Sequence, residues 1–352
     1  MEKKNRLYWI DAIKSFAIVT VLLIHAIQEV YMLDPDTVNS HDLLYRVGVL
    51  SAFVVGRIGV PLFFMSTGYL LLGRDYTNES IVRFWKRNWL GLIITTEIWY
   101  LIYDIFLKYY VGKPIVKTTV IKNMLFIQPI DFTHNPTWYM PVIIGIYLFI
   151  PFVAILLKKV SNKVLIIPVA VVVFYSMVVP VADKLLLAHG KDGVYGLTDL
   201  NFSGGLYGVM LIMGYKACDV LSRIKTRYVV LFGMLNFAVT VLLQLVCYER
   251  GAIYLTWYDN VFLVLCTVCI FVTFSRKDRF RLQKLWGQLS KCSFGIYLIH
   301  KPIMTVVEKY SMKYSEHVNV AVLFAVVFAI SWGTVTVISK IPKLNKILLY
   351  VK

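Results

Sequence analysis

Charged residues are scarce in this sequence, and acidic residues are the scarcest among them. Asp, Glu, Lys and Arg make up 16% of the 352 residues, whereas soluble domains carry about 25%. Hydrophobic residues reach 59%, and the mean hydropathy is +0.69. This composition excludes an ordinary soluble protein and predicts an all-α, polytopic integral membrane protein.

The shortage of acid leaves 37 Lys and Arg against 20 Asp and Glu, a formal net charge of +17. In a soluble protein this excess would suggest a nucleic-acid partner. In a membrane protein it is explained by the enrichment of Lys and Arg in cytoplasmic loops. We therefore expect contact with membrane lipid and no binding of nucleic acid.

Cysteine is also rare, with five residues scattered along the chain. Cys266 and Cys269 have the CxxC spacing of metal and redox sites, but they lie inside the apolar run VFLVLCTVCIFVTF without a second pair. They are typical of small apolar residues in a helix. The sequence therefore predicts no metal site and no redox couple.

No hydrophilic stretch is long enough for a soluble domain, so residues 1–352 are expected to form a single membrane domain. Ten apolar stretches approach the ~20 residues that span a bilayer. They lie at 7–30, 47–72, 89–107, 137–157, 164–182, 204–221, 228–247, 254–274, 292–310 and 318–339. The basic start of the chain resembles a signal peptide, but the run that follows is long and has no cleavage site, so we expect it to be retained.

The distribution of basic residues predicts the orientation. With both termini in the cytoplasm, about 23 of the 37 Lys and Arg fall in cytoplasmic segments. This predicts a multi-pass protein of the cell membrane with both termini cytoplasmic. The outer stretch 108–136 departs from the rule because it carries Lys108, Lys113, Lys117 and Lys122. It is either an exception or a surface for an anionic substrate.

The first apolar stretch carries three ionisable side chains, Asp11, Lys14 and His25. The spacing from Lys14 to His25 corresponds to about three helical turns and roughly 16 Å, so both lie on one stripe. Asp11 lies one turn before Lys14 on nearly the same face. Ionisable groups inside a bilayer cost about 2.5–3.5 kcal/mol each, and they usually face a bundle interior or a wet cavity.

Each of these residues also has an ordinary interpretation. Asp11 and Lys14 suit a pair at the inner interface, with Lys14 extending toward water. His25 suits a neutral histidine that is hydrogen-bonded between helices. Three such groups on one stripe favour a functional site, and we take Asp11, Lys14 and His25 as candidate catalytic residues.

The second apolar stretch holds Arg57 at membrane depth, and Pro61 and Gly68 are predicted to interrupt its helix. Broken helices expose backbone donors and acceptors, which are tolerated only against protein or a cavity. The alternative is a kinked helix that serves packing. We expect Arg57 to contribute to binding of a cofactor.

The segment that follows, 73–88, is rich in Arg and Lys. Arg83 and Arg87 are four residues apart and share a face if the stretch is helical. Guanidinium groups bind phosphate through paired hydrogen bonds. Together with Lys14 they suit a phosphate-binding mouth at the cytoplasmic side, whereas ordinary membrane anchoring by positive charge is the alternative.

Four residues in later spans are candidates for binding a substrate. Glu97 lies a little under halfway into the third span, where a carboxylate needs a partner. Trp138 and Tyr139 fall at the outer interface, where aromatic residues are ordinary, but they also suit stacking on a sugar ring. His300 lies mid-span before a proline and has the same two interpretations as His25.

At these positions the chain resembles the acyltransferase 3 family of membrane acyltransferases. The resemblance lies in four motifs that follow one another along nearly the whole chain, YWIDAIKSFAIVTVLLIH, RIGVPLFFMSTGYLLLG, NPTWYMPVIIGIYLFIP and SFGIYLIHKPIM. The family's first-span signature is Arg or Lys, ten residues and then His, which Lys14 and His25 match. Lys14 departs from the commoner Arg and loses its bidentate fork, and Thr67 departs from the usual Ser before Gly68.

The resemblance implies transfer of an acyl group, usually acetyl from acetyl-CoA, to a hydroxyl of a glycan or lipid-linked sugar at the outer face. It implies that His25 is essential and that Lys14, Arg83 and Arg87 handle the donor. Some relatives carry a fused soluble domain that completes the transfer. Without one, this chain is expected to act alone or with a separate glycan-synthesis or transfer partner.

The residues and the resemblance together suggest a mechanism. We expect the CoA phosphates to bind Lys14, Arg83 and Arg87, and the pantetheine arm to bring the thioester near His25. His25 then acts as a general base on the acceptor hydroxyl, a role typically worth ~10²–10⁴-fold. Direct acylation of the histidine is the alternative route.

Asp11 or Glu97 is expected to orient a neighbouring cation. Two rival functions use the same buried charges. One is a transporter or flippase of a glycan intermediate, and the other is a membrane scaffold for glycan synthesis.

Overall fold

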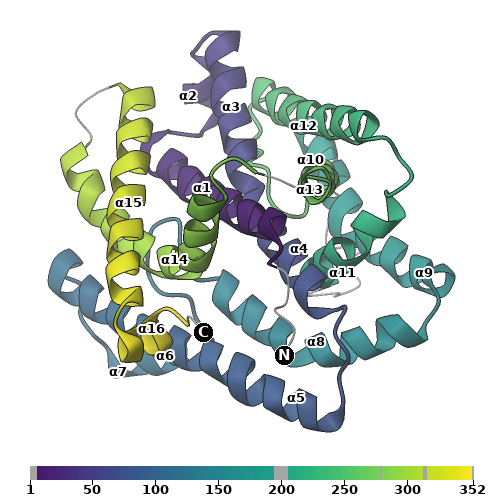
Figure 1. The fold of residues 1–352 in the computed structure, drawn as a ribbon. Helices are drawn as coiled ribbons and strands as arrows, with labels where there is room; N and C mark the ends of the chain where they lie inside the picture. The colour runs from purple at the N-terminus through teal and green to yellow at the C-terminus, as the bar shows by residue number, and fades with distance from the viewer. Residues whose placement is uncertain (1–5, 194–204, 278–279, 312–314, 351–352) are drawn as a thin grey trace. The chain divides into compact units, whose positions relative to one another are not determined.

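The computed structural model describes residues 6–193, 205–277, 280–311 and 315–350. Within these ranges the chain is mostly helical and contains no strand, in agreement with the predicted all-α class (Figure 1). The chain divides into two compact units. The first comprises Met1–Arg74 and Ala154–Ser290, and the second comprises Asp75–Val153 and Lys291–Lys352.

The helices follow the apolar stretches of the sequence. The α-helices are α1 (Tyr8–Val30), α2 (Pro35–Asn39), α3 (Leu43–Arg57), α4 (Gly59–Leu71), α5 (Asn78–Phe84), α6 (Leu90–Phe106), α7 (Lys117–Met124), α8 (Tyr139–Lys159), α9 (Asn162–Val173), α10 (Val179–Ala188), α11 (Gly205–Val220), α12 (Thr226–Glu249), α13 (Val261–Ser275), α14 (Gln283–Ser311), α15 (Glu316–Ser339) and α16 (Pro342–Leu348). The π-helical turns are η1 (Trp85–Trp89), η2 (Leu107–Val111) and η3 (Phe174–Val178).

Among the described residues, 7 helical stretches are long and apolar enough to cross a membrane. The other three predicted stretches, 204–221, 254–274 and 292–310, fall on α11, α13 and α14, and residue 204 lies outside the described residues. Helices α11 and α13 are short, with 16 and 15 residues, and α14 carries several lysines. The structure therefore agrees with an integral membrane protein, but it does not bear out the count of ten spans.

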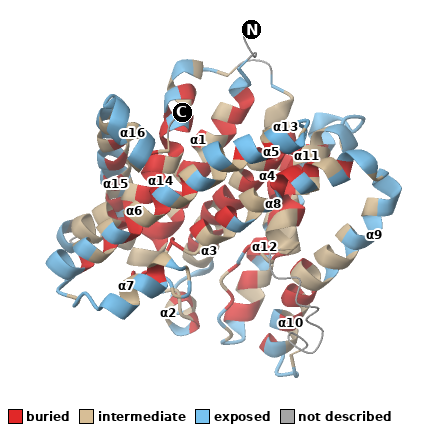
Figure 2. Cartoon of the chain, turned by 90° about the horizontal axis from the view of Figure 1, so that it is seen from below, coloured by how far each residue is buried: buried red, intermediate tan, exposed pale blue. Residues whose placement is uncertain are grey.

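Helix α9 illustrates the membrane character of the chain. It is almost wholly apolar, yet none of its side chains is buried (Figure 2). Ile166 and Ile167 are 63% and 70% exposed. An almost wholly apolar helix with such exposed side chains suits lipid rather than water as its surroundings.

Helix α1 forms the centre of the first unit, where it packs against α3, α4 and α13. Two glycines allow the close approach of the second span. A Cβ at Gly56 would lie 2.7 Å from the Cβ of Ile24, and a Cβ at Gly59 would lie 2.5 Å from the carbonyl oxygen of Ala17. The junction between α3 and α4 is thereby held directly against α1.

The interruption of the second span lies at Ile58, between α3 and α4. Pro61 explains it, because proline has no N–H for the carbonyl of Arg57 four residues earlier. Gly68 does not interrupt the helix, contrary to the prediction, since α4 continues through it. A Cβ at Gly68 would lie 2.0 Å from the carbonyl oxygen of Leu211 in α11. This glycine therefore serves close packing between two helices.

Helix α13 begins seven residues later than the predicted span 254–274. Asn260 caps the N-terminus of α13, because its side-chain oxygen accepts hydrogen bonds from the backbone N–H groups of Phe262 and Leu263, at 2.9 and 3.0 Å. The preceding segment is non-helical but contains buried residues, among them Thr256 and Tyr258. The backbone N–H of Thr256 donates to the Gln244 side chain of α12 at 3.0 Å.

Replacing Asn260 with alanine is expected to destabilise the first unit by about 1–3 kcal/mol. The change removes the cap of α13 and also the partner of the buried Tyr254 hydroxyl, which accepts from the Asn260 amide at 2.7 Å. Thermal unfolding in detergent measures the effect. Asn162→Ala is the matched control, because Asn162 is exposed, and equal unfolding temperatures in the two variants would contradict this role.

In the second unit, α6 is tied to neighbouring segments by aromatic side chains that donate to backbone carbonyls. Trp99 donates to Leu348 at 2.7 Å, and Tyr103 donates to Leu298 of α14 at 2.5 Å. Tyr100 donates to Thr137, just before α8, at 3.2 Å. These bonds fix α6 against the segments that carry the candidate substrate-binding residues.

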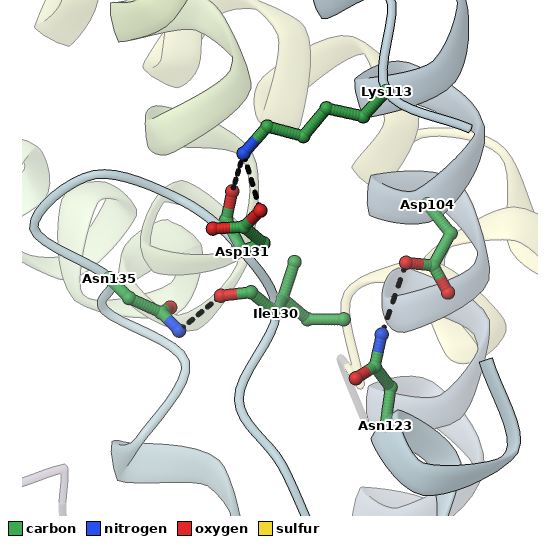
Figure 3. A network of polar contacts seen from close by, with 6 residues as sticks. All are labelled: Asp104, Lys113, Asn123, Ile130, Asp131 and Asn135. Carbon is green, nitrogen blue, oxygen red and sulfur yellow. Dashed lines mark hydrogen bonds and ion pairs between the residues drawn. The ribbon is translucent and has the colours of Figure 1, made fainter. Parts of the chain in front are cut away.

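The stretch 108–136 is held by polar contacts (Figure 3). Lys113 forms an ion pair with Asp131 at 2.5 Å, and Asn123 of α7 donates to Asp104 of α6 at 3.2 Å. Asn135 donates to the carbonyl of Ile130 at 2.5 Å. Lys113, one of the four lysines that depart from the predicted distribution of positive charge, is thus neutralised by the carboxylate of Asp131.

Candidate active site

The start of α1 is fixed by side chains of its first turns. Asp11 accepts from the guanidinium of Arg6 at 2.5 Å, and Arg6 also donates to the carbonyl of Gly287 at 3.0 Å. Ser15 donates to the carbonyl of Trp286 at 2.8 Å. The hydrogen bond from Arg6 to the Asp11 carboxylate raises the pKa of that arginine. Asp11 is therefore the partner of Arg6.

Lys14 lies one turn beyond Asp11 and is half-buried. Because Asp11 pairs with Arg6, the ammonium group of Lys14 has no ion pair within 4.0 Å among the residues that the structure describes. A half-buried cation that forms no ion pair favours a bound anion. Lys14 thus has the property expected of a residue that binds an anionic ligand.

His25 lies farther along α1 on the same side of the helix as Lys14, and its side chain is only 9% exposed. Asp11 and His25 are 14 positions apart in one continuous helix, which corresponds to roughly 21 Å along its axis. The three residues of the predicted stripe therefore lie in one helix, with Asp11 and Lys14 near its start and His25 deep in the bundle.

Arg57 is a deeply buried cation of the first unit, with 4% exposure. Its Cζ atom lies 4.3 Å from the ring centroid of Trp257, 4.9 Å from that of Phe53 and 5.5 Å from that of Tyr258. Its Nη1 donates to the Tyr258 hydroxyl at 3.5 Å. We refer to Phe53, Trp257 and Tyr258 as the aromatic cage of Arg57.

The backbone brings Arg57 and His25 to the same helix crossing. Gly56 abuts Ile24, and Arg57 and His25 are the next residues in α3 and α1. The non-helical segment before α13 supplies Trp257 and Tyr258 to the cage. Arg57 is therefore enclosed by α3 and by this segment, and His25 lies on α1 beside the contact between Gly56 and Ile24.

The basic residues after the second span belong to the second unit. Arg83 lies on α5 and Arg87 on η1, and both are exposed. The indoles of Trp85 and Trp89 donate to backbone carbonyls of α8, both at 3.1 Å. The tryptophans attach this stretch to α8, and π-helical turns of this kind are frequent at functional sites.

The candidate substrate-binding residues gather in the second unit. The rings of Trp138 and Tyr139 lie 6.1 Å apart, and Tyr139 lies 5.4 Å from Tyr297 of α14. His300 packs against Tyr297 at 5.9 Å and is fully buried, with its Nδ1 2.5 Å from the Tyr297 carbonyl oxygen. The structure thus brings Trp138, Tyr139 and His300 together.

Glu97 lies on α6 one turn before Tyr100, whose hydroxyl donates to the carbonyl of Thr137. It therefore approaches the same group from α6. One of its carboxylate oxygens, Oε2, is buried and has no hydrogen-bond partner in the described part of the chain. Glu97, like Lys14, is available to a ligand.

The sequence singles out His25, Lys14 and Arg57 as candidates but not Trp257 and Tyr258, which the structure places around Arg57. The sequence WYDN directly before an apolar run was the available signal, because an asparagine there favours a helix start and leaves the aromatic pair in a non-helical segment. Within the described ranges no three His, Cys, Asp or Glu side chains form a group that could hold a metal ion. All five cysteines are free thiols.

Comparison with protein families shows the family of the chain. The acyltransferase 3 family model, described as an acyltransferase domain, matches residues 7–336. No curated protein and no solved structure matches the chain. The family match includes every candidate residue from Asp11 to His300. The chain therefore belongs to the acyltransferase 3 family and is a membrane acyltransferase.

Proposed function

We propose that this protein is a membrane O-acyltransferase that moves acetyl from cytoplasmic acetyl-CoA to a hydroxyl of a cell-surface glycan or lipid-linked sugar. The family supports acyl transfer. The observation that carries the proposal is the arrangement on α1. Lys14 forms no ion pair within the described part of the chain, and His25 lies buried about three turns farther along the same stripe.

The donor enters from the cytoplasmic side. Lys14 binds a CoA phosphate, because its ammonium is half-buried and lacks a carboxylate partner among the described residues. Arg83 and Arg87 supply further charge for the phosphates, and Asp11 holds Arg6 at the start of α1. The pantetheine arm then extends along the stripe from Lys14, and the roughly 16 Å to His25 is a distance that such a flexible arm can span.

His25 acts as the general base in the transfer. It accepts the proton of the acceptor hydroxyl while the hydroxyl oxygen bonds to the thioester carbonyl carbon. The C–S bond then breaks, the CoA sulfur takes the proton from His25, and the acceptor keeps the acyl group as an ester. A positioned base of this kind typically contributes ~10²–10⁴-fold.

The acceptor binds through the aromatic group of the second unit. Trp138 and Tyr139 offer partly exposed rings for a sugar face, and Glu97 offers a carboxylate oxygen for sugar hydroxyls. His300 is fully buried, so its part is to hold Tyr297 and Tyr139 in place. Lys14 and the base thus belong to the first unit, and the aromatic group proposed for the sugar belongs to the second.

We further propose that residues 1–352 act as one acyltransferase domain in the cell membrane, with ten spans and both termini in the cytoplasm. Helices α11, α13 and α14 are the additional spans in this scheme. Among family members, the four sequence motifs resemble in particular the bacterial O-acetyltransferase of enterobacterial common antigen. An acceptor built in the cell envelope, with or without a separate glycan-synthesis partner, is consistent with that resemblance.

Replacing Lys14 with alanine is expected to raise the KM for acetyl-CoA about 10- to 100-fold, because a charge-assisted contact to phosphate is worth about 1.5–3 kcal/mol. Steady-state kinetics in nanodiscs measure the change, and Lys14→Arg is expected to retain activity. Lys216→Ala is the matched control, because Lys216 is also a half-buried lysine in a helix of the first unit. An unchanged KM in Lys14→Ala would remove this residue from donor binding.

Transfer of radiolabelled acetyl in purified membranes tests the proposed function against its main rival. An acyltransferase incorporates label into an envelope glycan and releases CoA. A transporter or flippase moves the glycan without consuming acetyl-CoA, and that result would contradict the proposal.

A further inference from the structure

Arg57 is a permanent cation in an enclosed, largely apolar place. A guanidinium carries five N–H donors. The contact from Arg57 Nη1 to the Tyr258 hydroxyl, at 3.5 Å, is long for a hydrogen bond. Its Nε atom is buried without a hydrogen-bond partner, and among the described residues no carboxylate lies within 4.0 Å of the guanidinium. Most of its donor capacity is therefore unused.

The surroundings of Arg57 do not compensate for the loss of water. Contacts with ring faces contribute about 0.5–2 kcal/mol each, whereas burying an ion without a counter-charge costs several kcal/mol. Asp259 follows Tyr258 in the sequence, but among the described residues no ion pair joins its carboxylate to Arg57. An exposed cation would avoid this cost, so the placement favours a group that binds Arg57 during function.

The cage also restricts which group this is. Its walls are three aromatic rings, and no second cation lies among them, so it offers little to a strongly hydrated phosphate. A single oxygen that carries partial negative charge suits this environment better. Trp257 is 36% exposed, so the cage is closed on the protein side and borders the outside at this ring.

The position of the cage relates it to the transfer step. Gly56 and Ile24 are in contact, and Arg57 and His25 follow them in α3 and α1. The base and the guanidinium thus lie on the two helices that meet at this contact. The break at Ile58 and the closely packed Gly59 fix the backbone on the other side of Arg57, so the guanidinium is held in advance of binding.

We propose that Arg57 stabilises the negative charge that develops on the thioester carbonyl oxygen during acyl transfer. As the acceptor oxygen bonds to the carbonyl carbon and His25 takes its proton, the C=O electron pair moves onto the oxygen and Arg57 donates hydrogen bonds to it. The pair returns when the C–S bond breaks, and the thiol leaves with the proton from His25. This inference rests on the proposed function and adds a catalytic residue to it.

The test compares Arg57→Gln with the wild type in nanodiscs, with acetyl-CoA as donor and a cell-envelope extract as acceptor. A donor that acts mainly in the transition state typically contributes ~10²–10³-fold to kcat, and we expect a loss of that size. CoA has no acyl carbonyl, so Arg57 has no oxygen of this kind to bind in the CoA complex. The dissociation constant of CoA from Arg57→Gln is therefore expected to stay within about threefold of the wild-type value, because the contacts that hold CoA are made by other residues. Arg46→Gln, on the same helix and paired with Glu249, is the matched control and is expected to keep wild-type kcat.

The outcomes separate this inference from the proposed function. No acetyl-CoA turnover by the wild type overturns both. Turnover by the wild type with normal kcat in Arg57→Gln overturns only the role of Arg57. Weaker CoA binding with unchanged kcat assigns Arg57 to the phosphates and also overturns it. If Arg57→Gln does not give a monodisperse protein, Arg57→Lys is tested instead, because it keeps the positive charge but lacks the paired N–H donors of a guanidinium. Unchanged kcat in that variant overturns the proposal.

Discussion

Replacing His25 with alanine is expected to lower acyl transfer by at least ~10²–10⁴-fold, the contribution of a positioned general base. The loss is expected in kcat, because a base acts in the transition state and contributes little to binding of the donor. The protein should still reach the membrane, since His25 is one side chain among many buried residues of α1. Incorporation of radiolabelled acetyl into membranes measures the effect.

The matched control for this variant is His189→Ala. His189 is exposed at the end of α10, and its Nδ1 atom lies 2.7 Å from the carbonyl oxygen of Leu185. Its replacement is expected to leave transfer unchanged. Full activity in His25→Ala, at equal protein level, would remove His25 from the mechanism and with it the proposed use of the α1 stripe.

Replacing Gly68 or Gly214 with alanine is expected to prevent correct packing of α4 on α11. A Cβ at Gly68 would lie 2.0 Å from the carbonyl oxygen of Leu211, and one at Gly214 would lie 2.1 Å from that of Met65. Both contacts are with backbone, which cannot rotate away as a side chain can. Overpacking usually costs about 1–3 kcal/mol, and we expect these backbone clashes to cost at least about 3 kcal/mol.

Thermal unfolding and gel filtration in detergent measure this effect. Gly208→Ala is the matched control, because Gly208 lies on α11 as well and a Cβ there would meet nothing within 4 Å. The control is expected to unfold like the wild type. A stable, monodisperse Gly68→Ala protein would show that α4 and α11 do not pack as closely as described.

The sequence predicted the helical class because apolar runs near 20 residues have few alternatives in a bilayer. It also predicted the stripe of Lys14 and His25, which depends only on helical spacing. The partner of Asp11 was not predicted, because Arg6 lies before the helix. A nearby ion pair depends on how the chain enters the helix, which spacing alone does not determine.

Tertiary contacts account for the other differences. Gly68 is predicted to interrupt a helix, but in the structure it allows close packing against the backbone of Leu211, which is far away in the sequence. The predicted span 254–274 includes Tyr254 to Tyr258 because these residues continue the apolar run. In the structure the helix begins only after them, at Val261, because Asn260 caps it. The cage of Arg57 combines two distant segments, and no local pattern joins them.

The most direct test of acyl transfer is CoA release from acetyl-CoA by the purified protein in nanodiscs, comparing the wild type with His25→Ala, first without acceptor and then with a cell-envelope extract. We predict release by the wild type that the extract stimulates and that His25→Ala abolishes. A well-folded wild-type protein that neither binds nor turns over acetyl-CoA would contradict the proposed acetyl transfer and favour transport of a glycan intermediate.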